Sequence, residues 1–243
     1  MTSINDGGRV AVVTGASSGI GEATGRALAG AGYRVALLAR RVERLEKLAD
    51  ELGNGSIAIQ ADVTERDSLV AAAARVQDEL GGANVLVNNA GIMLLGPFSD
   101  AQRDDYRRMI EVNLLGAITA TEVFLEQLRT NGGDIINLSS VAGRTARAGN
   151  GVYAATKWGI NGWSESLRLE LLPDVRVTLI EPGVVATELP GHITHGATKD
   201  AVGELYSRAE VTAEDIAEII AFAITRPRHL ALHEILVRPS GQQ

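Results

Sequence analysis

The sequence predicts a three-layer α/β fold, a doubly wound sheet of seven parallel strands with helices on both faces. Short β-branched runs alternate with stretches of helical period, the pattern of parallel strands joined by right-handed crossovers. The 243 residues are 45% hydrophobic, enough to bury a large core without disulfides. There are 27 glycines but only nine Phe, Trp and Tyr residues, which suits tight turns and close helix–strand packing.

The alternation assigns the elements in chain order. Strands are expected at residues 10–13, 34–38, 56–59, 85–87, 134–138, 176–180 and 234–237. Helices are expected at residues 19–31, 42–52, 65–80, 100–128, 152–172 and 212–225. Thr64 with Asp67, and Thr212 with Asp215, fit capping boxes at two helix starts. No linker or repeat interrupts the pattern, so we expect one domain over residues 1–243.

A glycine-rich turn follows the first strand and leads directly into a helix. It reads Thr14-Gly15-Ala16-Ser17-Ser18-Gly19-Ile20-Gly21, a Gly-x3-Gly-x-Gly spacing rather than the commoner Gly-x-Gly-x2-Gly. Glycine lets the backbone approach a pyrophosphate, whose charge is stabilised by the helix N-terminus. A glycine loop alone is often only a structural turn, but its place between the first strand and a helix favours a phosphate cradle.

Two arginines follow the second strand, where NAD-preferring folds of this kind usually have an acid for the ribose 2′-hydroxyl. Arg40 lies 19 residues beyond Gly21, with Arg41 next to it. Guanidinium groups suit a 2′-phosphate, so we expect NADP(H) as cofactor. The alternative is a solvated helix start, although cations there oppose the helix dipole and need a compensating anion. Asp62, which precedes Val63, is either an acceptor for an adenine amino group or a turn or cap residue.

Candidate reacting groups gather in the second half of the chain. Asn88-Asn89-Ala90-Gly91 follows the fourth strand and Ser139-Ser140 follows the fifth. Tyr153 and Lys157 are four residues apart and share one helix face. A phenol with a pKa near 10 is a poor acid–base catalyst at neutral pH, and a nearby ammonium lowers that pKa. Ser140 could then polarise a carbonyl while Tyr153 delivers a proton. Taken alone, Tyr-x3-Lys is usually an ordinary surface pair.

The segment from about residue 184 to 210 has no clear period, and we expect it to be a substrate lid. His192 and His195 lie within it, three residues apart. Two histidines without a third ligand are weak evidence for a metal, so we expect no metal site and regard them as lid residues.

Charge and composition limit the partners. The net charge is −7 and no basic block is present, so neither nucleic acid nor an anionic membrane is expected to bind. The absence of cysteine excludes disulfide scaffolds, thiolate metal sites and cysteine catalysis. Residues 1–8 lack the basic and apolar regions of a signal peptide, and the uncharged stretches are too short to span a bilayer, so we expect a cytoplasmic protein.

The motifs quoted above occur together, with Ser140 lying 13 residues before Tyr153 and Pro182-Gly183 following the sixth strand. In this combination, the chain resembles the short-chain dehydrogenase/reductase family over roughly residues 8–240. The resemblance implies a Rossmann-type sheet of strand order 3-2-1-4-5-6-7. It also implies an NADP(H)-dependent oxidoreductase that interconverts a carbonyl and an alcohol by hydride transfer.

The resemblance also implies roles for single residues. Tyr153 would be the acid–base, and Lys157 would bind the nicotinamide ribose and lower the tyrosine pKa. Ser140 would orient the carbonyl, and Asn113 would hold a proton-relay water. The expected cofactor contacts are Gly15, Ser17, Ser18, Gly19, Ile20, Gly21, Arg40, Arg41, Asp62, Val63, Asn89, Ala90, Gly91, Tyr153, Lys157, Pro182, Gly183, Val185 and Thr187.

Residues 88–97, 191–199 and 233–239 are similar to the clavulanic acid dehydrogenase-like members of that family, which reduce the aldehyde of a bicyclic β-lactam with NADPH. The expected substrate is therefore an aldehyde or ketone, with such a secondary metabolite as one candidate. Two alternatives remain: an NAD-preferring polyol or hydroxy-acid dehydrogenase, which Arg40 disfavours, and a catalytically silent cofactor-binding regulatory protein. The presence of Asn113, Ser140, Tyr153 and Lys157 together favours an enzyme.

The helices expected at residues 100–128 and 152–172 carry apolar side chains on more than one face. Helices of this kind at the flank of a sheet need a second partner. The family resemblance adds a four-helix dimer contact here, so we expect a homotetramer, with a dimer as the fallback. The segment 238–241 differs from the glycine-rich end of many family members, which leaves the C-terminal subunit contact open.

Overall fold

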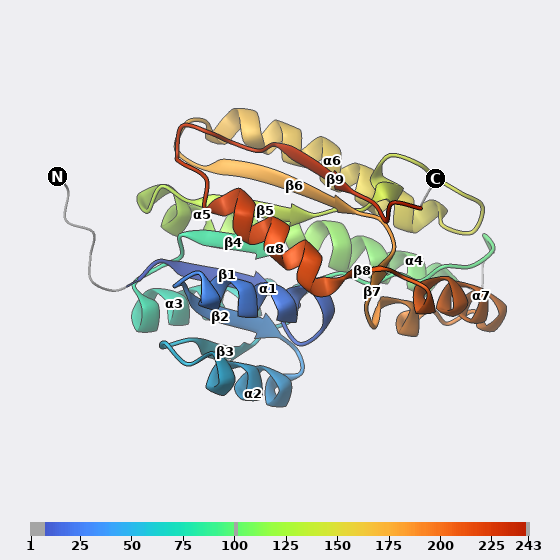
Figure 1. The fold of residues 1–243 in the computed structure, drawn as a ribbon, viewed down its shortest axis with the longest axis horizontal. Coiled ribbons are helices and arrows are strands. Elements are labelled where there is room, and N and C mark those ends of the chain that lie inside the picture. The colour runs from blue at the N-terminus through green and yellow to red at the C-terminus, as the bar shows by residue number, and fades with distance from the viewer. Residues whose placement is uncertain (1–7, 100–101, 242–243) are drawn as a thin grey trace.

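A computed structural model describes residues 8–99 and 102–241. A parallel seven-stranded sheet of order β3-β2-β1-β4-β5-β6-β9 runs through its centre (Figure 1), which confirms the expected fold class and strand order. The strands are β1 (Val10–Thr14), β2 (Arg34–Ala39), β3 (Ile57–Gln60), β4 (Val85–Asn88), β5 (Asp134–Leu138), β6 (Arg176–Pro182) and β9 (Glu234–Val237).

Helices cover both faces of the sheet (Figure 1). One face packs against α1 (Gly19–Gly30), α2 (Val42–Leu52) and α8 (Ala213–Ile224). The other packs against α3 (Arg66–Leu80), α5 (Gly116–Thr130) and α6 (Gly151–Leu171). The central strands are buried on both faces, which explains why they read as continuous apolar runs rather than as alternating patterns.

The long helix expected over residues 100–128 is built from three segments. They are α4 (Arg103–Ile110), a π-helical turn (Glu111–Leu115) and α5, while the expected start at Asp100 lies outside the described residues. A π-helical turn contains one residue more than an α-helical turn and is common near functional sites. It includes Asn113, which is 2% exposed.

One of the two expected capping boxes is present. Thr212 accepts a hydrogen bond from the Asp215 backbone, and the Asp215 carboxylate accepts one from the Thr212 backbone. The prediction for Thr64 and Asp67 was wrong, because α3 begins at Arg66 after Glu65 and has no side-chain cap. The Thr64 hydroxyl donates instead to Asp62 Oδ1 at 2.8 Å, which makes Asp62 a turn residue.

The segment expected to be a lid contains regular structure that the sequence did not reveal. A two-stranded parallel sheet pairs β7 (Val185–Ala186) with β8 (Val211–Thr212), and between them lie a 3₁₀ turn (Leu189–His192) and α7 (Gly196–Ser207). No residue of α7 is buried. Val202 and Tyr206 pack, partly buried, against the apolar cluster beside Tyr153. This pair is too short a stripe to mark an amphipathic helix in the sequence.

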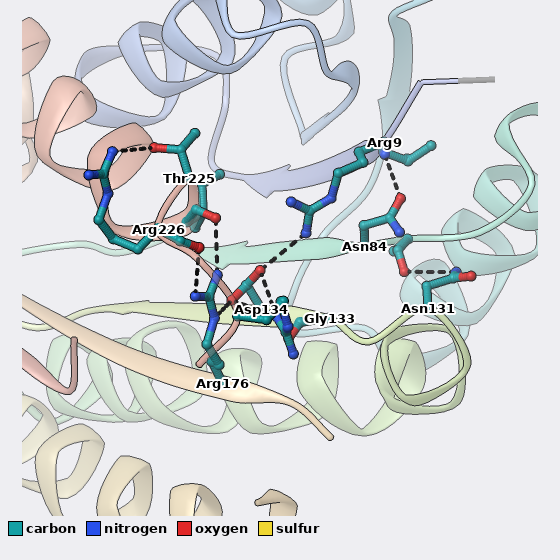
Figure 2. Close-up of polar contacts among 12 residues, drawn as sticks. Arg9, Asn84, Asn131, Gly133, Asp134, Arg176, Thr225 and Arg226 are labelled. Atoms are coloured by element: carbon teal, nitrogen blue, oxygen red, sulfur yellow. Dashed lines mark hydrogen bonds and ion pairs between the residues drawn. The ribbon is translucent and has the colours of Figure 1, made fainter. Parts of the chain in front are cut away.

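A cluster of charged residues ties together the amino end of the sheet (Figure 2). Asp134, which begins β5 and is 2% exposed, accepts a hydrogen bond from Arg176 Nε at 2.6 Å. Arg9 and Arg228 approach the same carboxylate at 3.3 Å. Arg176 also donates to four backbone carbonyls at and beyond the C-terminal end of α8, those of Ile224, Arg226, Pro227 and Leu230. Asp134 and Arg176 together thus link β5 and β6 to the end of α8.

None of the helices in the described ranges has the length and apolar character needed to cross a membrane.

Candidate active site

A cleft of about 400 Å³ lies along the carboxyl ends of β1 to β6. Most of the residues expected to contact a cofactor line it: Gly15, Ser17, Ser18, Gly19, Ile20, Arg40, Arg41, Asp62, Val63, Asn89, Ala90, Gly91, Tyr153, Lys157, Pro182 and Thr187. The fold therefore brings together residues that are up to 172 positions apart, since the ends of parallel strands meet at one edge of a sheet.

Three expected cofactor contacts are not part of this wall. Gly21 has a packing role: a Cβ there would lie 2.4 Å from the Gly15 carbonyl oxygen and 2.4 Å from Asn89 Nδ2. Val185 is 4% exposed and belongs to the core under α8, and Gly183 donates its backbone N–H to the Val237 carbonyl in β9. Sequence spacing predicted the neighbourhood of these residues, but not which way each one faces.

The glycine-rich loop has the geometry of a phosphate cradle. Gly15 (φ +66°) and Gly19 (φ +55°) adopt a left-handed backbone that favours glycine. Ser18, which precedes α1, forms no side-chain cap, so its hydroxyl leaves the first N–H groups of the helix to another acceptor. Asn89 Nδ2 donates to the carbonyl oxygens of Thr14 and Gly15 and fixes the loop from the neighbouring strand. These features fit a bound pyrophosphate.

The two arginines at the other end of the cleft differ in their surroundings. Arg40 is exposed and lines the cleft, and within residues 8–99 and 102–241 no protein acceptor is found for its guanidinium. Arg41 precedes α2 and donates to Ser17 Oγ (3.1 Å) and Ser18 Oγ (2.7 Å). Its guanidinium also pairs with the Glu188 carboxylate at 3.3 Å, which supplies the anion that a cationic helix start needs.

Tyr153, Ser140 and Lys157 meet beside the cleft. The Lys157 ammonium lies 5.8 Å from the centre of the Tyr153 ring and donates to the Leu138 carbonyl at 2.8 Å. Burial raises the pKa of Tyr153, and a hydrogen bond with Ser140 acts in the opposite direction. Burial also lowers the pKa of Lys157 to about 8. Burial therefore outweighs the lowering by Ser140, and the pKa of Tyr153 is raised where the sequence predicted a lowering by Lys157.

Asn113 is close to this group, but its side chain is engaged by protein. Its Oδ1 accepts from the Ile92 backbone N–H at 2.8 Å, and its Nδ2 donates to the Ile92 carbonyl at 2.9 Å. Nδ2 also lies 3.2 Å from Thr156 Oγ1 on α6. The Asn113 side chain therefore fixes the segment after β4 against α6.

Sequence reasoning missed a polar network behind Ser140. Ser139 Oγ donates to Asn161 Oδ1 at 2.6 Å, and Asn161 Nδ2 donates to Glu181 Oε1 at 2.7 Å. Glu181 is fully buried, and Arg144 donates two of its nitrogens to this carboxylate. This network attaches the turn after β5 to β6. The charged Glu181 next to the apolar pair Leu179-Ile180 was the signal that could have indicated it.

His192 and His195, the two histidines of the segment expected to be a lid, have different surroundings. His192 lines the cleft, and burial together with the charges of Arg41 and Arg40 lowers its pKa. His195 precedes α7, where its Nδ1 accepts a hydrogen bond from the Thr198 backbone.

The family model for the short chain dehydrogenases matches residues 9–198. The chain belongs to this family. The expectation from the sequence is confirmed at the level of the family. The similar solved structures also include short-chain dehydrogenases.

An uncharacterised oxidoreductase from Staphylococcus saprophyticus is 37% identical over the whole chain and 99% of its own length. An alcohol dehydrogenase from Thermococcus sibiricus, solved with 5-hydroxy-NADP, is 32% identical with a TM-score of 0.87, over 97% of this chain and 98% of that one. A serine dehydrogenase in its closed form with NADP⁺ is 35% identical with a TM-score of 0.88, over 96% of both chains.

Proposed function

We propose that this protein is a carbonyl reductase, or alcohol dehydrogenase in the reverse direction, that uses NADP(H). The observation that carries this proposal is the placement of Tyr153, Lys157 and the glycine-rich loop on one cleft that ends at Arg40 and Arg41. The solved relatives complexed with NADP⁺ or an NADP derivative support the choice of cofactor. The expected location remains the cytoplasm.

The glycine-rich loop would hold the pyrophosphate, the arginines would hold the 2′-phosphate, and Lys157 would hold the nicotinamide ribose. The bound cofactor supplies the hydride that reduces the carbonyl carbon. Tyr153 then donates its phenolic proton to the carbonyl oxygen, while Ser140 donates a hydrogen bond that orients the same oxygen. Asn113 remains the proposed anchor of a relay water. Its Oδ1 and Nδ2 already bond to Ile92 and Thr156, so we assign this role to its backbone carbonyl.

The pKa directions fit reduction near neutral pH. Because burial raises the pKa of Tyr153, the phenol keeps its proton and is ready to donate it. Oxidation requires the phenolate, so its rate should rise as the pH rises. With a pKa of about 8, Lys157 remains largely protonated at pH 7, where its charge favours ionisation of the phenol, and it loses that charge as the pH rises above 8.

A second cavity of about 230 Å³ touches Tyr153 and supports an apolar substrate. Its wall includes Leu94, Phe98, Tyr106, Met109 and Val152. We propose an aldehyde or ketone with an apolar portion, and a bicyclic β-lactam aldehyde is one candidate. Single-turnover oxidation of NADPH against an aldehyde and ketone panel tests this assignment. Binding of NADPH without turnover of any compound would favour a silent regulatory protein instead.

The cofactor preference can be tested at Arg40. Arg40→Asp should lower kcat/KM for NADPH by roughly 10- to 100-fold, because a charge-assisted hydrogen bond to phosphate is worth about 1.5–3 kcal/mol. The value for NADH should change little or rise. Arg129→Asp makes the same charge change at an exposed position of α5 outside the cleft and should leave the ratio unaltered. Equal kcat/KM values for NADPH and NADH in the unmodified enzyme would refute the assignment of Arg40 and Arg41 to the 2′-phosphate.

We also propose a homotetramer. Large apolar side chains at about half exposure on α4, the π turn and α6 are Ile110, Leu115, Trp158 and Leu169. Phe222 on α8, Leu230 after it and Leu236 on β9 are further exposed apolar side chains. Light scattering should give about four times the 25.6 kDa chain mass at micromolar concentration. Trp158→Asp should shift this mass downward, whereas a monomer in the unmodified protein would refute the proposal.

A further inference from the structure

Glu188 connects the lid to the arginine end of the cleft. It follows Thr187 directly and lies just before the 3₁₀ turn Leu189–His192, so it belongs to the first residues of the lid. Its carboxylate is exposed and faces two guanidinium groups from the start of α2. Arg44 approaches it at 3.1 Å and Arg41 at 3.3 Å. These arginines precede Glu188 by 144 and 147 residues.

The contact is made inside the proposed cofactor site. Glu188 lines the same cleft as Arg41, Ser17 and Ser18, and Arg41 donates to both serine hydroxyls as well as to Glu188. The remaining acid of the cleft wall, Asp62, already accepts from the Thr64 backbone and hydroxyl. Glu188 is therefore the carboxylate that neutralises this group of arginines. The two arginines in turn hold its pKa below the usual range, so it is ionised at neutral pH.

We propose that Glu188 is a cofactor-specificity residue that competes with the 2′-phosphate of NADP(H) for Arg41 and Arg44. In the free protein, the carboxylate takes the place of the phosphate. When NADP(H) binds, the phosphate takes over the arginines and the carboxylate moves away from them. This inference rests on the proposed function, which assigns Arg41 to the 2′-phosphate. It adds Arg44, the second partner of Glu188, to that site.

The expected size of the competition follows from exposure. Side-chain exposures of 44%, 49% and 55% for Arg41, Arg44 and Glu188 make both ion pairs solvent-screened. Exposed pairs contribute little each, so a doubly charged phosphate can displace the carboxylate. The loss of two such pairs corresponds to roughly a threefold to tenfold change in the affinity for a 2′-phosphorylated ligand. A dinucleotide without the 2′-phosphate has no need to displace Glu188 and should be nearly insensitive to it.

The experiment is calorimetric titration of the intact protein with two fragments, adenosine 2′,5′-bisphosphate and adenosine 5′-phosphate. Glu188→Gln should bind the bisphosphate roughly threefold to tenfold more tightly at low ionic strength and leave the monophosphate unchanged. Glu204→Gln is the matched control. It removes the same charge from the lid, at a residue that pairs with Arg208 instead of with the α2 arginines.

Weaker bisphosphate binding in Glu188→Gln would mean that the acid positions the arginines, and an unchanged affinity would mean that it is a bystander. Either result overturns the proposal, as does an equal gain in Glu204→Gln. When Glu188→Gln is introduced into the Arg41→Gln/Arg44→Gln double variant, the affinity for the bisphosphate should no longer increase. If the unmodified protein does not prefer the bisphosphate, the cofactor assignment itself fails and this inference fails with it, an outcome visible before any variant is measured.

Discussion

Tyr153→Phe is expected to lower kcat/KM for carbonyl reduction by about 10²–10⁴-fold, the usual contribution of general acid catalysis. Phenylalanine keeps the buried ring, which is 7% exposed, and removes only the hydroxyl that delivers the proton. The affinity for NADPH should be nearly unchanged, because we assign the ribose contact to Lys157. Steady-state kinetics combined with fluorescence titration of NADPH separates the two effects.

Tyr33→Phe provides the matched control. Tyr33 is also buried, but its ring lies under Arg9 at the amino end of the sheet, opposite the cleft. Removal of that hydroxyl should leave turnover unaltered. Retention of more than a tenth of the activity by Tyr153→Phe would assign proton donation to another group, and His192 on the cleft wall would be the first to examine.

Asp134→Asn should destabilise the folded protein by about 3–5 kcal/mol, the cost of leaving a buried charge without its partner. Asparagine fits the same space but provides no counter-charge for Arg176, whose side chain is 5% exposed. Urea denaturation should show a lower midpoint with an unchanged slope. Glu122→Gln is the control: it breaks an ion pair with Arg66 that is 58% exposed on both sides and should leave the urea midpoint nearly unchanged. A midpoint for Asp134→Asn equal to that of the control would show that the buried Arg176 does not need this carboxylate.

The sheet could be predicted because its information is local. Most strands of the main sheet are short, largely apolar runs, and their bounds were predicted to within about two residues. The glycine loop, the Asn-Asn-Ala-Gly turn and Tyr153-x3-Lys157 could be placed on one cleft because parallel strands end at one edge.

The features that sequence reasoning missed depend on partners far away in the chain. Asp134 gives no sign that Arg176 and Arg228 will surround it, and Glu188 gives no sign that Arg41 and Arg44 lie across the cleft. The π-helical turn around Asn113 is equally invisible, because the flanking residues continue a normal helical pattern. The direction of the Tyr153 pKa depends on burial, which a four-residue spacing does not report.

The absence of buried residues from α7 has a consequence for local stability. A segment that buries so little apolar surface opens at a free energy far below that of global unfolding, whereas the central strands open only when the whole molecule does. Hydrogen exchange should therefore be fast for the amides of residues 198–207 and slow for those of β1 and β5, where every residue is buried. If residues 184–210 act as the substrate lid that the sequence predicts, activity would then decline on gradual warming below the calorimetric transition and return on cooling.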